Sequence, residues 1–226
     1  MITSSPMGRR WVKRSIDVVA SLVGLALLSP VLGTVALAIR LMMGQPVFFR
    51  QPRPGQHGRP FVLLKFRTMT ETDSHSGSGQ QVPPLGSFLR RASIDELPQL
   101  WNILKGEMSL VGPRPLSMEY FPLYTSEEAR RHDVLPGLTG WAQVNGRHRL
   151  SWDERFQLDV WHVDHWSLWL DIKILGMTVR KVFSGAGEAP PPTADFGVDR
   201  EPVVARRPLE SSGITAHSPD NVSRGT

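Results

Sequence analysis

The sequence predicts an α+β, mostly helical, monotopic membrane protein with an N-terminal re-entrant helix, a short β-hairpin and interfacial amphipathic helices. Three observations lead to this prediction. Residues 18–39 form an uncharged apolar run, residues 46–66 contain two strand-like segments around a turn, and residues 151–183 repeat apolar side chains with a helical period.

Composition divides the chain into three parts. A basic segment and the membrane helix occupy 1–45, and a cytoplasmic domain that includes the interfacial helices is expected over 46–183. Residues 184–226 are rich in Gly, Pro, Ser and charge and have few large apolar residues, so we expect a disordered tail there.

The chain as a whole is basic. Its 226 residues include 26 Lys and Arg against 21 Asp and Glu, for a formal net charge of +5. Such an excess suits an anionic partner, namely nucleic acid, a lipid surface or a phosphorylated substrate. The absence of cysteine excludes disulfides, thiolate metal sites and a cysteine nucleophile.

The apolar run VVASLVGLALLSPVLGTVALAI, at 18–39, is the strongest local signal. Its length matches a bilayer core of about 30 Å. A buried core helix is the weaker alternative, because a run without a polar face is rare in a small soluble domain. The long run and the missing cleavage site also differ from a cleaved signal peptide.

Basic residues flank the apolar run on both sides, and positive charge is retained on the cytoplasmic side of a membrane. A single straight crossing cannot satisfy both flanks. Pro30 removes the donor that would bond the carbonyl of Ala26, which predicts a bend, and the Ser29 hydroxyl is expected to satisfy a freed carbonyl. We therefore expect a re-entrant helix kinked at Ser29-Pro30, with a kinked full span as the alternative. The flanking basic residues are Arg9, Arg10, Lys13, Arg14, Arg40, Arg50, Arg53 and Arg59.

The next elements are a hairpin, a loop and a helical region. Residues 46–51 and 59–66 read as strands around the turn PRPGQHG, and the polar stretch 70–84 reads as a mobile loop. Helical spacing follows from 85, where Leu97, Leu100, Trp101 and Leu104 share one face and Gly106 ends the helix.

Residues 151–183 are expected to form two helices. The second, WSLWLDIKILGMTVRKVF at 166–183, combines Trp and Leu with Lys173, Arg180 and Lys181. That composition fits a helix lying among lipid headgroups. An ordinary amphipathic core helix fits equally well, so both interpretations stay open.

Asp95 and Glu96 stand together in SIDELPQLWN, close to a predicted helix start. Neighbouring residues on a helix point about 100° apart, so the pair cannot share a proton face to face. Ser93 with Glu96 matches a capping box, while Pro98 prefers the first helical position. Under either reading the helix dipole favours ionised carboxylates, and plain helix capping is the structural alternative to a functional pair.

Several arginines surround this pair in the sequence. Arg90 and Arg91 lie upstream, Arg114 stands between two prolines in GPRP, and Arg147 ends the glycine-punctuated segment 136–147, in which Trp141 is available for stacking. Arginines that converge on carboxylates suit a phosphate-bearing substrate, and a divalent cation would be required between phosphates and carboxylates. Nucleotide-binding glycine motifs, H-E-x-x-H and EF-hand patterns are absent from the sequence.

These motifs resemble those of the bacterial sugar transferases of the monotopic phosphoglycosyl transferase family. The resemblance extends from about residue 13 to 183, with its blocks in the family's order. The blocks are KRSIDVVASLVGLALLSP, RPFVLLKFRTM, SIDELPQLWNILKGEMSLVGPRPL, PGLTGWAQVNGR and ERFQLDVWHVDHWSLWLDIKIL.

The resemblance implies a reaction and a place. Family members transfer a sugar-1-phosphate from a UDP-sugar to polyprenyl (undecaprenyl) phosphate, with UMP leaving, and so begin the synthesis of exopolysaccharide or another surface glycan. It implies the bacterial cytoplasmic (inner) membrane, with the catalytic domain at 46–183 on the cytoplasmic face and in contact with membrane lipid. A homodimer is one possible assembly, and the resemblance implies no nucleic-acid partner.

The resemblance also implies roles for residues. Asp95 would be the nucleophile and would contact the required Mg²⁺, while Glu96 would assist metal binding or proton transfer. Arg90, Arg114 and Arg147 match the family's phosphate- and nucleotide-binding arginines, and Ser29-Pro30 matches its re-entrant kink. The tail segment AGEAPPPTADFG departs from the family pattern, which puts any role of the tail in doubt.

Three rival functions are considered. A membrane-bound metal-dependent phosphatase would release phosphate or sugar phosphate without loading a lipid. A non-enzymatic membrane adaptor would tolerate Asp95→Asn and Arg114→Ala. A nucleic-acid-binding protein would explain the positive charge. The membrane segment and the clustering of arginines around acids argue against this last function.

Overall fold

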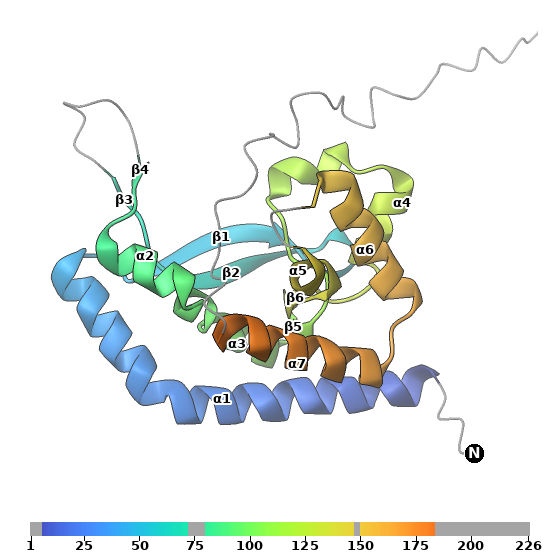
Figure 1. Cartoon of the computed structure of the whole chain (residues 1–226), viewed down its shortest axis with the longest axis horizontal. Coiled ribbons are helices and arrows are strands. Elements are labelled where there is room, and N and C mark those ends of the chain that lie inside the picture. Colours follow the sequence, from blue (N-terminus) through green and yellow to red (C-terminus); the bar gives the residue numbers. More distant parts are fainter. Residues whose placement is uncertain (1–5, 72–79, 147–149, 184–226) are drawn as a thin grey trace, which may run out of the picture.

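The computed structural model describes residues 6–71, 80–146 and 150–183 of the chain. Its first element is one long helix, α1 (Pro6–Met42), which runs along one edge of the molecule and bends (Figure 1). The portion Gly8–Met42 is long and apolar enough to cross a membrane, and its most apolar window is only 6% buried. A core helix of a soluble protein would be mostly covered, so α1 indicates membrane association.

Local bonding at the bend follows the sequence prediction. Pro30 lies inside α1, and Ser29 Oγ donates a hydrogen bond to the carbonyl of Ala26 at 2.8 Å. One turn later Thr34 Oγ1 donates to the carbonyl of Pro30 at 2.8 Å. Side-chain hydroxyls thus satisfy carbonyls that a proline leaves without a donor or that lie beside it.

The predicted hairpin is present. Strands β1 (Phe48–Pro54) and β2 (Pro60–Phe66) pair antiparallel, with Phe48 opposite Phe66 and Pro54 opposite Pro60. β1 continues three residues beyond the predicted end at Gln51, because the turn is made by the short 3-10 helix η1 (Gln56–Gly58).

The predicted loop at 70–84 is shorter than expected. Strands β3 (Thr70–Glu71) and β4 (Gln80–Gln81) form a small antiparallel ladder, and α2 (Pro84–Arg91) begins directly afterwards. Residues 72–79, which made up most of the predicted loop, lie outside the described residues.

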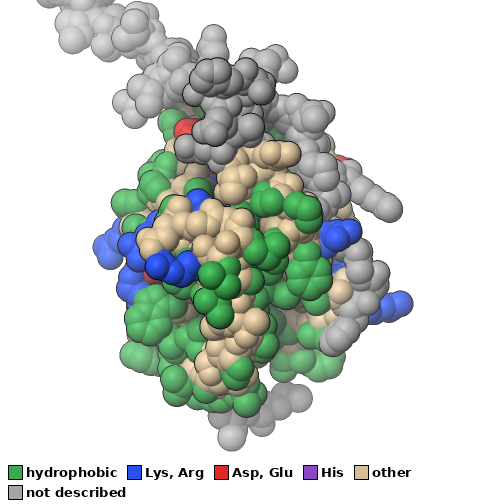
Figure 2. Space-filling model, turned by 90° about the vertical axis from the view of Figure 1, so that its left-hand side faces the viewer, with side chains coloured by type: hydrophobic (Ala, Val, Ile, Leu, Met, Phe, Trp, Pro, Cys, Tyr) green, Lys and Arg blue, Asp and Glu red, His purple; other side chains and the backbone are tan. Residues whose placement is uncertain are grey.

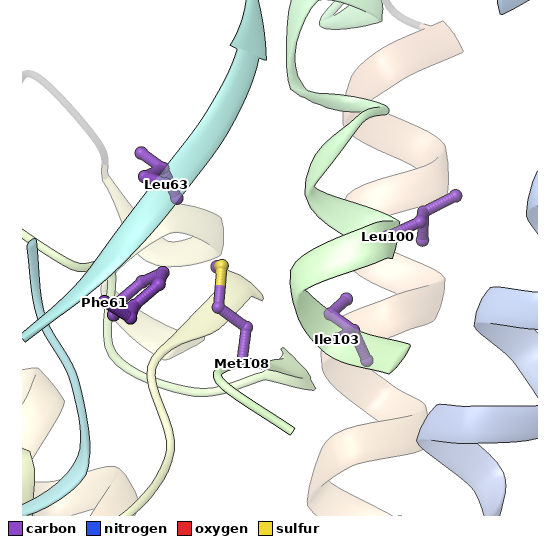
Figure 3. Packing of buried hydrophobic residues seen from close by; sticks show 5 residues of the cluster. All are labelled: Phe61, Leu63, Leu100, Ile103 and Met108. Carbon is purple, nitrogen blue, oxygen red and sulfur yellow. The ribbon is translucent and has the colours of Figure 1, made fainter. Parts of the chain in front are cut away.

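A hydrophobic core joins the hairpin to the next helix, α3 (Gln99–Lys105), which ends at Gly106 as predicted. Figure 3 shows five residues of this core, and Leu25 and Leu28 of α1 pack against it. Its buried members are Phe61, Leu63, Leu100, Ile103 and Met108.

The predicted buried face of α3 is wrong in one respect: Trp101 is 54% exposed, and Asn102 is buried instead. Hydrogen bonds explain why α3 turns Asn102 inward. Asn102 Oδ1 accepts from Leu64 N at 3.1 Å, and Nδ2 donates to Val62 O at 2.7 Å. These bonds satisfy backbone groups of β2. The side-chain amide of Asn102 therefore faces the hairpin, whereas the apolar pattern of the sequence had predicted Trp101 on the inner face.

The domain holds α1 near both of its ends. Near the N-terminal end, Arg14 donates to the carbonyls of Ile103 and Leu104 at 2.6 and 2.8 Å, and Asp17 Oδ1 accepts from Leu110 N at 3.0 Å. Near the C-terminal end, Ile39 is fully buried against Phe66 and Leu89. The two flanks of the apolar run therefore lie against the same domain.

Two three-residue strands were not predicted. β5 (Ser109–Val111) and β6 (Gly137–Thr139) pair in parallel, and Gly112 N donates to Thr139 O at 2.9 Å. The backbones come so close that a Cβ on Gly112 would lie 2.4 Å from the carbonyl oxygen of Leu135. This pairing joins the GPRP loop to the 136–147 segment. Between the strands lie η3 (Met118–Leu123), α4 (Ser126–Ala129) and η4 (Arg130–His132).

The C-terminal helices follow the prediction. After α5 (Trp141–Asn145), residues 151–183 form α6 (Trp152–Asp164) and α7 (Leu168–Phe183). Lys13 of α1 pairs with Asp171 of α7 at 2.6 Å, and the two helices lie side by side in Figure 1. Residues 184–226, predicted as a tail, lie outside the described residues.

One side of α7 is buried and the other is exposed and apolar. Leu170 and Ile174 face the core, whereas Trp169 is 74% exposed and Ile172 and Val179 are also exposed. Figure 2 shows one end of the molecule, where hydrophobic side chains cover the lower part and Lys and Arg lie above them. α7 therefore contributes to the core on one side and leaves apolar side chains exposed on the other, and its predicted position among lipid headgroups stays a prediction.

Candidate active site

The carboxylate pair lies in a short 3-10 helix, η2 (Ile94–Glu96), between α2 and α3. The capping-box prediction is wrong: Ser93 adopts a left-handed backbone with φ 55° and makes no side-chain capping bond. Pro98 is the residue that precedes the first turn of α3. The carboxylate pair therefore lies just before α3, and the helix begins close to the position that the preference of Pro98 for a first helical turn predicted.

Glu96 is the centre of an ion-pair cluster. Its Oε1 accepts hydrogen bonds from Lys65 Nζ at 2.6 Å and from Arg114 Nη2 at 2.7 Å, and Oε2 accepts from Arg114 Nη1 at 3.4 Å. Lys65 comes from β2 and Arg114 from the GPRP loop, so the cluster joins three distant segments. The sequence placed Arg114 near the carboxylate pair as a phosphate-binding residue, but it predicted neither the direct bond to Glu96 nor the presence of Lys65.

Glu96 is ionised in this environment. Burial alone would raise its pKa, but the charges of Arg114 and Lys65 and their hydrogen bonds outweigh burial and hold the pKa well below its usual value. A carboxylate with such a low pKa is a weak proton acceptor near neutral pH. Its clearest task is to fix the positions of the two cations.

Asp95 is buried, with 4% of its surface exposed. Ser93 and Glu96, on either side of it in the sequence, both line an adjoining cleft, and Asp95 is not among the lining residues. The left-handed backbone of Ser93 is a conformation that a non-glycine residue adopts at an energetic cost, and such positions are frequent at functional sites.

The cleft has a volume of about 380 Å³, within the usual range for small-molecule sites. α6 and α7 form two of its walls, and η2, the GPRP loop, the β6–α5 segment, β5 and η4 supply the other lining residues. Its charged lining consists of three arginines and two carboxylates, so positive charge is in excess. These charged residues are Arg114, Arg131, Arg155, Glu96 and Asp159.

A buried ion pair supports the GPRP loop. Arg131 donates to Asp159 Oδ2 from Nε at 3.1 Å and from Nη2 at 2.6 Å. Nη2 of the same arginine also donates to the backbone carbonyl of Arg114 at 2.8 Å. The ion pair between η4 and α6 therefore fixes the backbone from which Arg114 reaches Glu96.

The other predicted arginines are placed differently. Arg90 Nε donates to Thr68 Oγ1 at 2.8 Å, and Arg90 is not part of the cleft lining. Arg147 lies outside the described residues. Trp141 stacks on Trp161 with ring centroids 5.2 Å apart, so packing accounts for this ring. Substrate roles for Arg90 and Arg147 stay predictions.

The described residues contain no group of three or more His, Asp and Glu side chains arranged to hold a metal ion. Glu96 already faces two cations, Lys65 and Arg114, and Asp95 is the neighbouring carboxylate in the chain. One carboxylate agrees with the way Mg²⁺ is commonly bound beside phosphates, with the substrate and water supplying the other ligands. The residues present therefore fit a magnesium ion that arrives with a phosphorylated substrate.

Three residues of the candidate site escaped the sequence analysis: Lys65, which binds Glu96, and Arg131 and Arg155, which line the cleft. Lys65 stands in a strand, and Arg131 and Arg155 stand in helical segments, where single basic residues are normally solvated. No local pattern marks the two arginines, because Arg131 stands in the charged run SEEARRHD and Arg155 directly follows two acidic residues. Their convergence depends on the pairing of β5 with β6 and on the packing of α6, neither of which a local pattern reveals.

The family model of the bacterial sugar transferases matches residues 8–185. An uncharacterized sugar transferase of Bacillus subtilis, EpsL, is 53% identical over 181 residues, which cover 77% of this chain and 89% of that protein.

Two further relatives carry an activity in their names, UDP-glucose:undecaprenyl-phosphate glucose-1-phosphate transferase. The Escherichia coli protein is 42% identical over 188 residues, which cover 77% of this chain and 40% of that protein. The Caulobacter vibrioides protein is 43% identical over 186 residues, which cover 76% of this chain and 70% of that protein. The chain thus spans less than half the length of the E. coli relative. Since the family model matches most of its length, the chain belongs to the bacterial sugar transferase family and is an enzyme of that class.

Proposed function

We propose that the protein transfers a sugar-1-phosphate from a UDP-sugar to polyprenyl phosphate, and so forms polyprenyl-diphosphate sugar and UMP. One observation carries the proposal: an arginine-rich cleft adjoins the Asp95–Glu96 pair in a domain that lies along an apolar helix. The excess of arginine suits two phosphorylated substrates, and the helix suits an acceptor that stays in the bilayer. The names of the E. coli and C. vibrioides relatives support the same reaction class.

The proposed chemistry has two steps with Asp95 as nucleophile. In the first, an Asp95 carboxylate oxygen attacks the sugar-bearing phosphorus of the UDP-sugar, and the bond from that phosphorus to the bridging oxygen breaks, so that UMP leaves with the electron pair. In the second, a phosphate oxygen of the lipid attacks the same phosphorus and releases the Asp95 carboxylate. A covalent intermediate divides one transfer between unlike acceptors into two easier steps.

Access to Asp95 is part of this proposal. Asp95 is almost fully buried and is not among the cleft-lining residues, so a small movement of η2 must present its side chain to the substrate. The left-handed residue Ser93 stands at the beginning of this short element. Release of a costly backbone conformation there would supply part of the energy for such a movement.

Glu96 acts, in this scheme, through Arg114. Its ionised carboxylate holds the guanidinium at the cleft wall with hydrogen bonds of 2.7 and 3.4 Å. A prepositioned guanidinium offers donors to the developing charge of a phosphoryl transfer without reorganisation during the step. The proton-transfer role that family resemblance allowed is less suited to a carboxylate with such a low pKa.

Magnesium is the proposed cofactor, with Asp95 as its protein ligand. When bound, Mg²⁺ would neutralise the diphosphate and bring it against a carboxylate that would otherwise repel it. Glu96, by contrast, is bound by Lys65 and Arg114.

A re-entrant topology, with the catalytic domain on the cytoplasmic face of the bacterial inner membrane, completes the proposal. The domain contacts α1 from Lys13 at one end to Ile39 at the other. A helix that crosses the bilayer completely has its ends on opposite sides and cannot bring both to one domain. The Ser29-Pro30 bend supplies the necessary change of direction.

Release of UMP tests the function directly. Mixed with UDP-sugar and Mg²⁺ in the absence of lipid, the full-length protein is expected to release close to one UMP per molecule, and addition of polyprenyl phosphate should start continuous release. Release of inorganic phosphate without lipid product would identify a phosphatase. Absence of any turnover with UDP-glucose, UDP-galactose and their N-acetyl forms would contradict the proposal.

A further inference from the structure

Arg155 is a cleft residue to which the proposed reaction has assigned no task. It lies in the first half of α6 and lines the same cleft as Glu96 and Arg114. Its Nε and Nη2 atoms are buried and have no hydrogen-bond partner among the described residues. Buried donors without partners are costly, so their persistence indicates a missing acceptor.

Neighbouring groups explain the position of Arg155 but do not satisfy it. The guanidinium lies over the ring of Trp152, with its Cζ 4.7 Å from the ring centroid, which fixes the plane of the donors. Asp159, one helical turn further along α6, is bound by Arg131 through two hydrogen bonds. Glu96 is likewise bound by Lys65 and Arg114. Each carboxylate of the cleft lining thus has its own cationic partner.

Electrostatics point in the same direction. Burial lowers the pKa of Arg155, and the positive charge of Arg114 lowers it further, against an opposing effect of Asp159. Two guanidinium groups therefore repel each other across one cleft. An anion bound between them would relieve this repulsion and accept hydrogen bonds from the buried nitrogens.

We propose that Arg155 binds a phosphate group of a substrate in the cleft, together with Arg114. The inference rests on the proposed function for the nature of the substrates, and it assigns a phosphate site on α6 besides the arginines that the motifs indicated. A planar guanidinium suits two oxygens of a phosphate, whereas a lysine would offer a point charge. The phosphate belongs either to the nucleotide or to the isoprenyl phosphate, and both have the required chemistry.

Direct binding measurements test the inference without turnover. UDP and farnesyl phosphate are titrated separately into the full-length, detergent-solubilised protein by isothermal calorimetry. R155M keeps an apolar stem over Trp152 and removes the charge, and R155K keeps the charge and removes the planar donors. R130Q is the matched control, because Arg130 is an exposed arginine outside the cleft lining that pairs with Glu127 and Asp164.

We expect R155M to weaken binding of one of the two probes about tenfold or more, R155K to weaken it less, and R130Q to leave it unchanged. The probe that is affected identifies the source of the phosphate. Unchanged binding of both probes in R155M, or an equal loss in R130Q, would overturn the inference. Thermal unfolding of each variant checks that the fold is retained, and R155K provides the test if R155M is unfolded.

The outcome is separable from that of the proposed function. If R155M binds a phosphate probe more weakly than wild type, yet the wild-type protein never releases UMP from UDP-sugars, the proposed function is overturned and the Arg155 phosphate site is kept. An active enzyme in which R155M binds both probes normally would overturn the site and keep the function.

Discussion

Arg131 donates a hydrogen bond from Nη2 to the backbone carbonyl of Arg114 at 2.8 Å, while the same guanidinium is paired with Asp159. The relationship connects a buried ion pair of α6 to the loop that presents Arg114 to Glu96. Stability and activity therefore depend on the same contact. The first prediction follows from it.

Arg131→Met is expected to lower the free energy of unfolding by about 3–5 kcal/mol, because it leaves the buried Asp159 carboxylate without a counter-ion. UMP release should fall as well, since the Arg114 carbonyl loses its donor. Denaturant unfolding in detergent measures the first effect. Arg130→Gln removes an exposed ion pair and should leave stability nearly unchanged. Equal behaviour of the two variants would refute the argument.

Gly112→Ala is expected to destabilise the domain strongly and to abolish activity. An added Cβ would lie 2.4 Å from the Leu135 carbonyl oxygen, so β5 and β6 would have to separate and carry the GPRP loop with them. Gly176→Ala in α7 is the control, because nothing lies within 4 Å of its Cβ position. That variant should be neutral or more stable by up to about 1 kcal/mol. Thermal unfolding compares the two.

Acid should weaken the contact between α1 and α7. Burial raises the pKa of Asp171, but its hydrogen bonds and the charge of Lys13 outweigh this and hold the pKa below the ordinary value. A carboxyl group with a lowered folded-state pKa contributes stability above its unfolded pKa of about 3.9 and loses it as the pH falls through the folded value.

Asp171→Asn should accordingly be less stable than wild type at pH 7, and the gap should narrow below about pH 4. Melting temperatures measured from pH 7 to pH 3 test this. Glu96 has a lowered pKa in both proteins, so its effect cancels in the comparison. If the difference in melting temperature between wild type and Asp171→Asn stays constant from pH 7 to pH 3, Asp171 is excluded as the source of the pH-dependent stability.

The re-entrant topology predicts that both ends of α1 are cytoplasmic. Because the chain has no cysteine, single cysteines can be placed at Ser4 and at the exposed Ser126. A membrane-impermeant maleimide should label neither variant in intact spheroplasts and both after lysis. Labelling of one of them before lysis would indicate that α1 crosses the membrane completely.

Local patterns in the sequence predicted those parts of the fold that depend on local chemistry. The turn chemistry of residues 52–58 marks the β1–β2 hairpin, Gly106 ends α3, and Pro30 with Ser29 accounts for the bonding in α1. In each case a neighbouring residue or a regular period carries the structural information.

Non-local contacts account for the rest. β5 and β6 contain three residues each, too few for a period, and their pairing joins residues 109–111 to 137–139. The buried side of α3 was misplaced because Asn102 binds the backbone of β2. In the candidate site the motifs indicated Glu96 and Arg114, while Lys65 and Arg155 enter it through packing that no local pattern records.

The central claim is that the Asp95 carboxylate carries the sugar phosphate between the two substrates. Intact-protein mass spectrometry after incubation with UDP-sugar and Mg²⁺, without lipid, measures this directly. We predict a mass increase of one hexose phosphate or N-acetylhexosamine phosphate, located on Asp95, lost on addition of polyprenyl phosphate and absent in Asp95→Asn. An Asp95→Asn enzyme that loads the lipid at the wild-type rate would contradict the claim.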